Sequence, residues 1–362
     1  MLKDAVNIPV FIGHNIFSPE DAEKMLAEGN ADFVALGRSQ LAEPAWAKKA
    51  KEGRASDIKP CINCLIGCID RGMLSHTPIH CTVNPSLYRF ECKPVEKAET
   101  RKQVAVVGAG PAGCEAALTA SKRGHQVTIY EKRCIGGAMI EASKPENKAN
   151  IKRLIHYYED HIMHDPNITL VKEEVEYETL VHSGYDAVII AVGGKTRILN
   201  VPGIEKNSVI YASDYLNGST AVTGNTVVVI GGGITGAETA LELNAEGKKV
   251  TIVEMTDAFL ANFSSACQAY LATINETDIK ILTGKRLTAV HENNVILTDR
   301  WGNETTVPAD SVVIAAGFTS QNELSDKLEE NTDMQVFNVG DSKRIRQIYD
   351  AIHEGFIAAR QI

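Results

Sequence analysis

The chain reads QVAVVGAGPAG at residues 103–113 and TVVVIGGGITG at residues 226–236. In both places an apolar run leads into G-x-G-x-x-G, and a helical pattern follows. A second apolar run then ends in an acid, as QVTIYE at 126–131 and KVTIVE at 249–254. The acid stands 23 positions after the first glycine in each copy, from 108 to 131 and from 231 to 254. The repeat predicts a duplicated βαβ unit that binds dinucleotides.

Each part of this pattern has a physical role. The first glycine makes the tight turn, the second lets the backbone approach a pyrophosphate, and the third lets the helix pack on the strand. The helix N-terminus supplies N–H groups and a favourable dipole. The acid accepts hydrogen bonds from the adenosine ribose. The predicted cofactor-binding residues are Gly108, Gly110, Gly113 and Glu131 in the first copy and Gly231, Gly233, Gly236 and Glu254 in the second.

Two such units in one chain predict FAD in one and a nicotinamide nucleotide in the other, with hydride passing from NADH to the flavin. In the second copy, Glu254 would repel a 2′-phosphate, and the residues that follow it, MTDAFLANF, contain no Arg or Lys. NADH is therefore favoured over NADPH.

The eight cysteines include one cluster with the spacing C-x2-C-x3-C-x12-C, formed by Cys61, Cys64, Cys68 and Cys81. Three thiolates in one short stretch with a fourth downstream suit a cubane iron–sulfur cluster. A structural zinc remains the alternative, although zinc sites more often show two separated C-x2-C pairs. A single cluster in a long chain favours an intracellular metal site over a set of disulfides.

The composition predicts a folded protein of two to three domains. The chain has 362 residues, 44% of them hydrophobic and 23% charged, and a net charge of −9. No run approaches the ~18 apolar residues of a membrane span, and the N-terminus lacks a secretory signal. The acidic balance argues against a nucleic-acid partner. We expect a cytoplasmic protein without nucleic-acid or membrane partners.

The first 55 residues are typical of two strand–helix units. Strands are expected over 6–12 and 32–36, a helix from Ser18-Pro19 to about Glu28, and a second helix over 44–52. Two such units cannot close a sheet on their own.

The order of these segments resembles the C-terminal part of the 2,4-dienoyl-CoA reductase, trimethylamine dehydrogenase and enoate reductase family, whose barrel is of the old yellow enzyme type. Besides the two glycine-rich loops, the matching stretches are SPEDAEKMLAEGNADFVALGR (18–38), LAEPAW (41–46), CINC (61–64), CTVNP (81–85), EKRCIGG (131–137) and NVGD (338–341).

The resemblance implies a route for electrons and a set of roles. Family members pass hydride from NAD(P)H to FAD and then single electrons through a 4Fe–4S cluster to FMN, which reduces an activated C=C bond or, in some members, oxidises an amine. It implies cluster ligands at Cys61, Cys64, Cys68 and Cys81. It implies FAD contacts at Gly137, Gly340 and Asp341, and an FMN phosphate grip at Gly13, Gly37 and Arg38. His14 stands where many members carry a glycine.

The expected fold is α/β, with four parts. Residues 1–55 would be the end of an FMN-binding (β/α)8 barrel, 56–92 the 4Fe–4S segment, 100–220 plus 305–362 the FAD domain, and 221–304 the NAD(P)H domain. A complete barrel needs about 250 residues. Most of it, with the catalytic residues and the small-molecule substrate pocket, would therefore lie outside this sequence, and no catalytic residue is assigned.

Several functional readings stay open. A separate chain could supply the missing barrel, or the sequence could be a fragment, and exposed strand edges favour a homo-oligomer. The alternatives are an autonomous NADH diaphorase, a remnant that binds nucleotides without turnover, and a zinc-stabilised flavoprotein.

Overall fold

The computed structural model describes residues 3–87, 94–262 and 264–362. The chain forms two compact units. Unit 1 comprises Met1–Ser143, Asn147–Gly193 and Ser320–Ile362, and unit 2 comprises Lys144–Glu146 and Gly194–Thr319. Each unit contains one copy of the glycine-rich loop.

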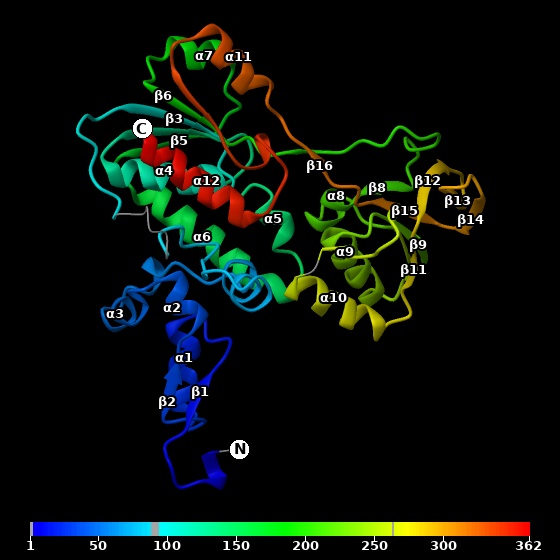
Figure 1. Cartoon of the computed structure of the whole chain (residues 1–362), viewed down its shortest axis with the longest axis horizontal. Helices are drawn as coiled ribbons and strands as arrows, with labels where there is room; N and C mark the ends of the chain where they lie inside the picture. The colour runs from blue at the N-terminus through cyan, green and yellow to red at the C-terminus, as the bar shows by residue number, and fades with distance from the viewer. Residues whose placement is uncertain (1–2, 88–93, 263) are drawn as a thin grey trace. The chain divides into compact units, whose positions relative to one another are not determined.

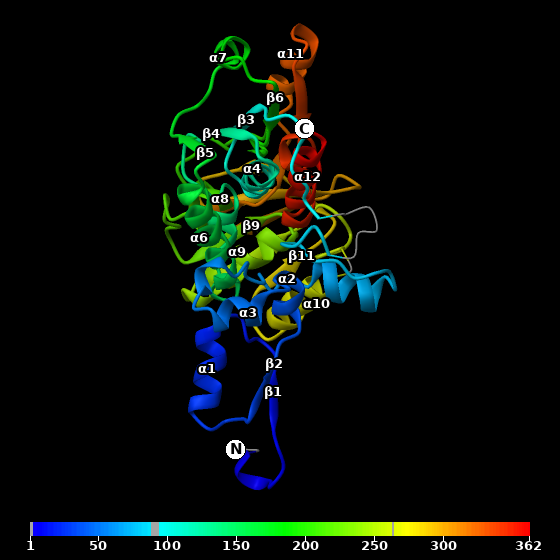
Figure 2. The same ribbon diagram turned by 90° about the vertical axis from the view of Figure 1, so that its left-hand side faces the viewer.

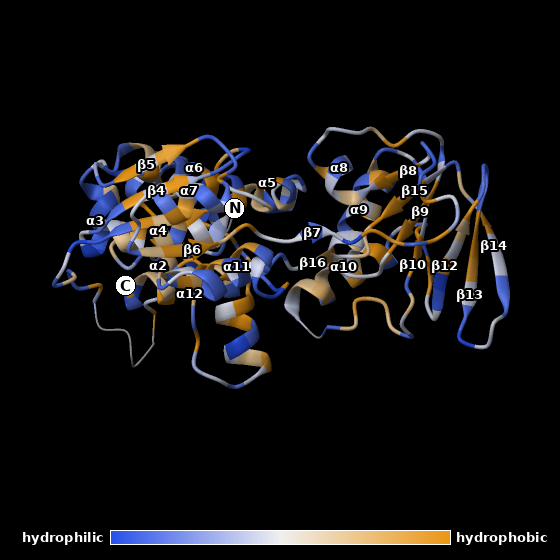
Figure 3. Ribbon diagram, turned by 90° about the horizontal axis from the view of Figure 1, so that it is seen from above, coloured by the Kyte–Doolittle hydropathy of each residue, from blue (hydrophilic) through white to orange (hydrophobic). Residues whose placement is uncertain are grey.

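A five-stranded parallel sheet forms the centre of unit 1, with the order β17-β6-β3-β4-β5 (Figure 1). Its strands are nearly continuous apolar runs, as a sheet covered on both faces requires, and Figure 3 draws them largely in the hydrophobic colour. The strands are β3 (Gln103–Val107), β4 (Gln126–Tyr130), β5 (Ile168–Val171), β6 (Ala187–Ile190) and β17 (Gln335–Asn338).

Helices cover both faces of this sheet. The larger core packs α4 (Pro111–Arg123), α6 (Ala149–His164) and α12 (Ile348–Gln361) on one face, beside the short α5 (Met139–Ala142). The smaller core packs α7 (Tyr177–His182) and α11 (Glu323–Asn331) on the other. Helix α12 lies so close to α4 that a β carbon on Gly355 would collide with the Ala112 carbonyl.

Unit 2 repeats the arrangement and adds an antiparallel sheet. Its parallel sheet has the order β11-β10-β9-β15-β8, and the antiparallel one has the order β12-β13-β14. The strands are β8 (Val209–Tyr211), β9 (Thr226–Ile230), β10 (Lys249–Val253), β11 (Lys280–Leu282), β12 (Lys285–Val290), β13 (Asn294–Asp299), β14 (Glu304–Pro308) and β15 (Ser311–Ile314). The helices are α8 (Ala212–Leu216), α9 (Ile234–Ala245) and α10 (Ser265–Asn275), and β7 (Lys195–Thr196) pairs with β16 (Phe318–Thr319).

The N-terminal segment of unit 1 forms two strand–helix units, with β1 and α1 visible in Figures 1 and 2. Ser18 caps α1 through a hydrogen bond from the Asp21 N–H (3.1 Å), with Pro19 at the first helical position. The helix expected here is confirmed. The elements are β1 (Phe11–Gly13), α1 (Pro19–Ala27), β2 (Phe33–Ala35), α2 (Arg38–Ala42) and α3 (Trp46–Lys51).

The strand expected over residues 6–12 is wrong in its extent, because β1 covers only Phe11–Gly13. Pro9 lacks an N–H and cannot donate to a strand ladder. The N–H of Val10 is bound by the Asp32 carboxylate at 2.8 Å instead. The strand can therefore begin only after residue 10.

The cysteine-rich segment contains an element that the sequence pattern did not reveal. Residues Ile66–Leu74 form a π-helix, η3, whose hydrogen bonds include Asp70 N to Leu65 O at 3.0 Å. A short 3-10 turn, η2 (Ala55–Asp57), precedes the segment. The end of the expected 56–92 segment, with Cys92, lies outside the described residues.

Among the described residues, none of the helices combines the length and the apolar character that crossing a bilayer requires.

Candidate functional site

The first glycine-rich loop has the backbone that its glycines predict. Gly108 has φ +100°, in the left-handed region that favours glycine, and its N–H donates to the Tyr130 carbonyl at 2.8 Å. A β carbon on Gly113 would collide with the Gly108 carbonyl. Gly110 caps α4 in an extended conformation (φ −73°, ψ −176°), ahead of Pro111. The start of α4 is therefore positioned to receive a phosphate group.

The second loop repeats this geometry. Gly231 has φ +121°, and its N–H donates to the Val253 carbonyl at 2.8 Å. A β carbon on Gly236 would collide with the Gly231 carbonyl. Gly233 caps α9 with φ −81° and ψ −176°. The duplication seen in the sequence is thus a duplication of backbone conformation.

The acid at the end of the second strand holds the loop in both copies. Glu131 Oε2 accepts from the Ala109 N–H at 2.8 Å, and Glu254 Oε2 accepts from the Gly232 N–H at 2.7 Å. Oε1 of Glu131 accepts from the Arg133 N–H at 2.7 Å, and Oε1 of Glu254 accepts from the Thr256 N–H at 2.7 Å. Each carboxylate is therefore already oriented at the loop where the ribose is expected.

The two copies differ in what lies over the loop. In the first copy, Gly136 N–H donates to the Ala109 carbonyl at 2.8 Å, and a β carbon on Gly137 would lie 2.9 Å from the Gly110 Cα. In the second copy, Leu260 N–H donates to the Gly232 carbonyl at 3.0 Å. A β carbon on Gly233, however, would have no atom of the described chain within 4 Å. In both copies a later segment thus binds the carbonyl between the first two glycines, and the first loop is packed more closely at its second glycine.

Gly340 and Asp341 lie beside the start of α4, in the short turn η5 (Gly340–Ser342). The N–H of Gly340 donates to Glu354 Oε2 at 2.8 Å, and a β carbon on Gly340 would lie 3.2 Å from the Ala112 β carbon. Asp341 Oδ1 accepts from the Arg346 N–H at 2.9 Å, and burial raises the pKa of Asp341 above its usual range. The fold thus brings this distant pair to the first glycine-rich loop, and its contact with a flavin stays a prediction.

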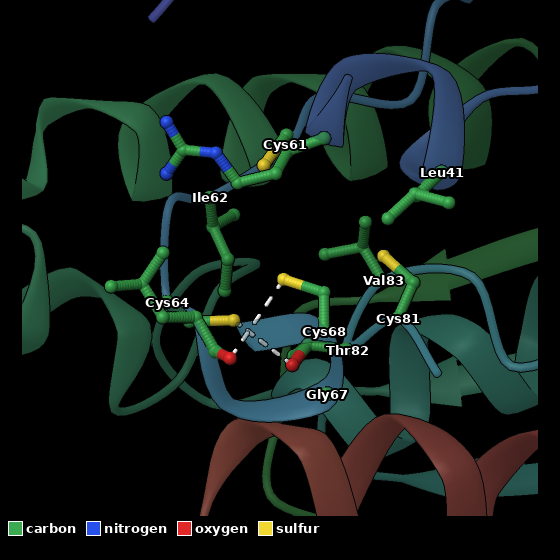
Figure 4. Close-up of a pocket in the computed structure, with 11 residues that line it drawn as sticks. Leu41, Cys61, Ile62, Cys64, Gly67, Cys68, Cys81, Thr82 and Val83 are labelled. Carbon is green, nitrogen blue, oxygen red and sulfur yellow. Dashed lines mark hydrogen bonds between the residues drawn. The ribbon is translucent and has the colours of Figure 1, made fainter. Parts of the chain in front are cut away.

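All four clustered cysteines line one small cavity, which Figure 4 shows from within. Cys64 Sγ lies 3.0 Å from Thr82 Oγ1, Cys61 Sγ accepts from the Asn63 N–H at 3.4 Å, and Cys68 Sγ donates to the Leu65 carbonyl at 3.7 Å. The remaining walls are mostly apolar and include Leu41, Ile62 and Val83.

The donor set of this cavity fits an iron–sulfur cluster, because four thiols meet in an apolar, partly enclosed space. Burial raises the pKa of Cys61 to about 11 and that of Cys81 to about 12, so that the metal-free thiols are protonated at neutral pH. Within residues 3–87, 94–262 and 264–362, no three His, Cys, Asp or Glu side chains converge as ligands of one metal ion.

Close backbone contact brings Cys68 and Cys81 together. The His80 N–H donates to the Gly67 carbonyl at 2.6 Å, and a β carbon on Gly67 would lie 2.8 Å from the His80 carbonyl oxygen. This contact joins the π-helix to the irregular segment before Cys81. Only a glycine at position 67 allows it without a shift of the backbone.

Two contacts that sequence reasoning missed fasten the cysteine loop to the first dinucleotide domain. Lys59 Nζ lies 2.5 Å from Glu115 Oε2, with Glu115 buried and Lys59 partly buried, and the Tyr158 hydroxyl donates to the same oxygen at 2.9 Å. His353 Nε2 donates to the Cys81 carbonyl at 2.8 Å. Glu115 is 56 positions from Lys59, so that no local pattern pairs them.

The predicted FMN-phosphate residues lie together but engage other partners. Gly13 ends β1, and Gly37 caps α2. The guanidinium of Arg38 donates to Asn63 and, at 2.8 Å, to Asn15, and it lines the cysteine cavity. His14 has φ +79°, so it keeps the conformation that a glycine favours. A contact of these residues with FMN stays a prediction.

Comparison with known proteins agrees with this geometry. Residues 102–355 match the family model described as pyridine nucleotide-disulphide oxidoreductase. An NADH oxidase from Thermoanaerobacter brockii is 38% identical over 100% of this chain and 56% of its own length. A cinnamate reductase from Clostridium sporogenes is 30% identical over 100% of this chain and 54% of its own length.

A solved structure extends the agreement to three dimensions. A 2-naphthoyl-CoA reductase in complex with 2-naphthoyl-CoA superposes with a TM-score of 0.89 at 30% identity, covering 100% of this chain and 55% of that one. The chain thus spans about half the length of the relatives that it matches. The resemblance seen in the sequence is confirmed: the chain belongs to the pyridine nucleotide-disulphide oxidoreductase family and corresponds to the C-terminal part of the NADH oxidase and enoate reductase-like proteins.

Proposed function

We propose that this chain is the NAD(P)H-oxidising, electron-delivering part of a flavin and iron–sulfur oxidoreductase. The family implies binding of FAD and NAD(P)H. The closer packing of the first loop supports a division between them: FAD binds at the first loop, and the nicotinamide coenzyme binds at the second, where a β carbon on Gly233 would have no atom of the described chain within 4 Å. A cofactor that stays bound benefits from a closed site, whereas a coenzyme that exchanges at each turnover needs an open one.

The observation that carries the proposal is the attachment of the thiol-lined cavity to the first domain. Cys61, Ile62 and Val83 share one buried core with the residues of α4 and α12. The Lys59–Glu115 ion pair and the His353–Cys81 hydrogen bond fix the same loop. A redox group in this cavity would therefore be held rigidly against the domain proposed to hold FAD.

In this proposal Cys61, Cys64, Cys68 and Cys81 are the ligands of a 4Fe–4S cluster. When bound, FAD accepts a hydride from the coenzyme and the cluster carries electrons singly; this chemistry belongs to the cofactors. The chain contributes the Asn63 N–H, which donates to Cys61, and the Thr82 hydroxyl, which lies beside Cys64. Such hydrogen bonds to sulfur, together with the apolar wall, set the potential of a cluster.

The acceptor of the electrons is proposed to be FMN in a (β/α) barrel that reduces an activated C=C bond, because the relatives named above include reductases of cinnamate and 2-naphthoyl-CoA. Within the described residues, β1 and β2 pair only with each other. The Phe11 ring is 67% exposed and stacks on Phe33 at 4.6 Å. We propose that further strand–helix units, on the same polypeptide or on a partner chain, cover the face of the β1–β2 sheet that carries Phe11 and Phe33. Gly13, Gly37 and Arg38 would then border the FMN phosphate.

The first test is the cofactor content of the protein purified without oxygen. We expect that acid releases FAD from the protein. We expect about four iron and four sulfide ions per chain, and we expect NADH to bleach the flavin absorption. Flavin that NADH cannot bleach would reject the function, leaving a nucleotide-binding protein without turnover. Zinc in place of iron would reject the cluster, and FMN together with FAD would favour a completed barrel.

The matched variants C64S and C114S distinguish the loss of a proposed cluster ligand from the loss of any buried cysteine. Cys114 is buried and donates to the Ala109 carbonyl at 3.1 Å, outside the cysteine cavity. C64S should lose iron while keeping FAD and its bleaching by NADH. C114S should keep both. Equal iron loss in the two variants would contradict the proposed ligand set.

A further inference from the structure

The fold brings a cation to the second nucleotide loop that the sequence around Glu254 lacks. Strand β12 begins beside this acid, since the Lys285 N–H donates to the Glu254 carbonyl at 3.0 Å. Asp299, at the end of β13, pairs with Lys285 across the antiparallel ladder. The turn that follows Asp299 therefore stands at the same edge of unit 2 as Glu254, and Arg300 is its first residue.

Arg300 reaches the loop that follows Glu254. Its Nη2 donates to Asp257 Oδ1 at 3.0 Å, and its guanidinium lies over the Trp301 ring, 4.7 Å from the centroid. The side chains of Arg300 and Asp257 are 62% and 69% exposed. An ion pair this exposed contributes about 0.2–1 kcal/mol, and a phosphate must displace Asp257 before it can bind the arginine. The stacking on Trp301 keeps the guanidinium in this neighbourhood.

A 2′-phosphate is the anion that distinguishes the two nicotinamide coenzymes here. Glu254 lies where the adenosine ribose is expected, and its charge opposes a phosphate on the 2′-oxygen. A planar guanidinium is suited to hold such a phosphate through two hydrogen bonds. Asp257 occupies the guanidinium of Arg300 in this structure.

We propose that Asp257 and Arg300 form a coenzyme-selectivity pair. Asp257 withholds Arg300 from the 2′-phosphate, and the preference for NADH depends on this contact in addition to the repulsion by Glu254. The inference rests on the proposed function, in that the second loop must bind the adenosine part of the coenzyme. The stretch MTDAFLANF after Glu254 contains no arginine, and Arg300 comes from 43 positions after Asp257.

The test measures binding of two probes to the full, FAD-loaded chain by calorimetry: 5′-AMP and adenosine 2′,5′-bisphosphate. The wild type should bind 5′-AMP more tightly. The substitution D257N should raise affinity for the bisphosphate about tenfold, the effect of one charge-assisted contact, and leave that for 5′-AMP within about twofold. The double substitution D257N/R300Q should lose the gain.

The control is E276Q, which removes one exposed carboxylate at the other end of the sheet, where α10 ends before β11. It should change neither affinity by more than about twofold. An equal gain in E276Q, or no gain in D257N while 5′-AMP still binds, would overturn the selectivity pair alone. Failure of every variant to bind either probe would reject the second loop as a nucleotide site, and the inference with it.

Discussion

The two glycine-rich loops have almost the same backbone and very different surroundings. Gly110 and Gly233 cap their helices with φ −73° and −81°, and Glu131 and Glu254 each bind the loop amide between the first two glycines. Among the described residues, only the first loop lies under a second glycine turn and beside a helix, α12, that touches α4 backbone to backbone. The local sequence thus determines the backbone of each loop, and residues distant in the chain determine how closely the loop is packed.

The largest effect on cofactor binding that separates the two copies is expected at the third glycine. A β carbon on Gly113 or Gly236 would collide with the carbonyl of the first glycine. Such overpacking costs about 1–3 kcal/mol and shifts the start of the helix. G113A should lose FAD, whereas G236A should keep FAD but lose its bleaching by NADH. The flavin-to-protein ratio and anaerobic titration with NADH measure the two outcomes.

Dithionite provides the control, because it should bleach the flavin of G236A without a coenzyme. Flavin loss in G236A with retention in G113A would reverse the assignment of cofactors to the two loops. Equal loss in both would mean that the variants unfold, which thermal denaturation of the apoproteins would reveal.

The next effect concerns the buried glutamate that follows each third glycine by two positions. Glu115 is held by Lys59 and Tyr158, and Glu238 accepts from the Tyr270 hydroxyl at 2.6 Å. K59M leaves a buried carboxylate without its cation and should cost about 3–5 kcal/mol of unfolding free energy. E238Q keeps an acceptor for Tyr270 and should cost about 1 kcal/mol. Chemical denaturation of the two variants compares them.

Variants of the Lys59–Glu115 ion pair also test whether Lys59 supports iron binding in addition to the stability of the fold. K59M should lose iron more readily than flavin, because Lys59 belongs to the cysteine loop and Glu115 to the first domain. The double variant K59M/E115Q should recover most of the lost stability, since no uncompensated charge remains. A K59M protein as stable as the wild type would show that the ion pair contributes nothing.

These contacts also mark the limit of prediction from sequence. The loops could be predicted because their signal is local: a strand, three glycines, a helix and an acid within 29 residues of chain, repeated once. The four clustered cysteines are equally local, and the structure gathers them around one cavity. The α1 helix followed from its capping residue Ser18 and from Pro19.

The missed features depend on residues that are distant in the chain. Lys59 and Glu115 are 56 residues apart in the sequence, and Arg300 and Asp257 are 43 residues apart. Only the completed fold brings the members of each pair together. The π-helix at Ile66–Leu74 differs from an α-helix in its hydrogen-bond partners, as from Asp70 N to Leu65 O, and the period of its apolar residues does not reveal that difference. The strand is shorter than the apolar run 6–12 because this run includes Pro9, which has no N–H to donate to a strand ladder.

A smaller and more specific effect is expected at the second glycine of each loop. Alanine fits the extended backbone of both positions, and the nearest atom to a β carbon on Gly110 is 4.0 Å away. G110A and G233A should therefore leave unfolding free energy within about 0.5 kcal/mol of the wild type. The added methyl stands where a pyrophosphate approaches. FAD retention in G110A should fall more than NADH affinity in G233A.

The closer packing of the first loop is the reason for this asymmetry, because Gly137 stops the first loop from moving away from the methyl group. Equilibrium dialysis measures FAD retention in G110A, and the KM for NADH measures the change in NADH affinity in G233A. A larger loss in G233A than in G110A would mean that the closer packing of the first loop does not constrain its ligand.

The smallest expected effect separates stability from cofactor binding at Asp341. Burial raises the pKa of this carboxyl, so the native state holds the proton more tightly than the unfolded state. Its favourable contribution is present at low pH and is lost as pH rises through the raised pKa. D341N carries no charge and can still accept from the Arg346 N–H. The flavin-free variant should therefore melt about 1–2 °C above the wild type at pH 8, with the difference shrinking toward pH 4.

FAD retention in D341N should fall while NAD⁺ binding is unchanged, because Asp341 lies beside the first loop. A Tm difference that grows toward low pH would contradict the assigned cause, and a loss of NAD⁺ binding would contradict the separation of the two sites.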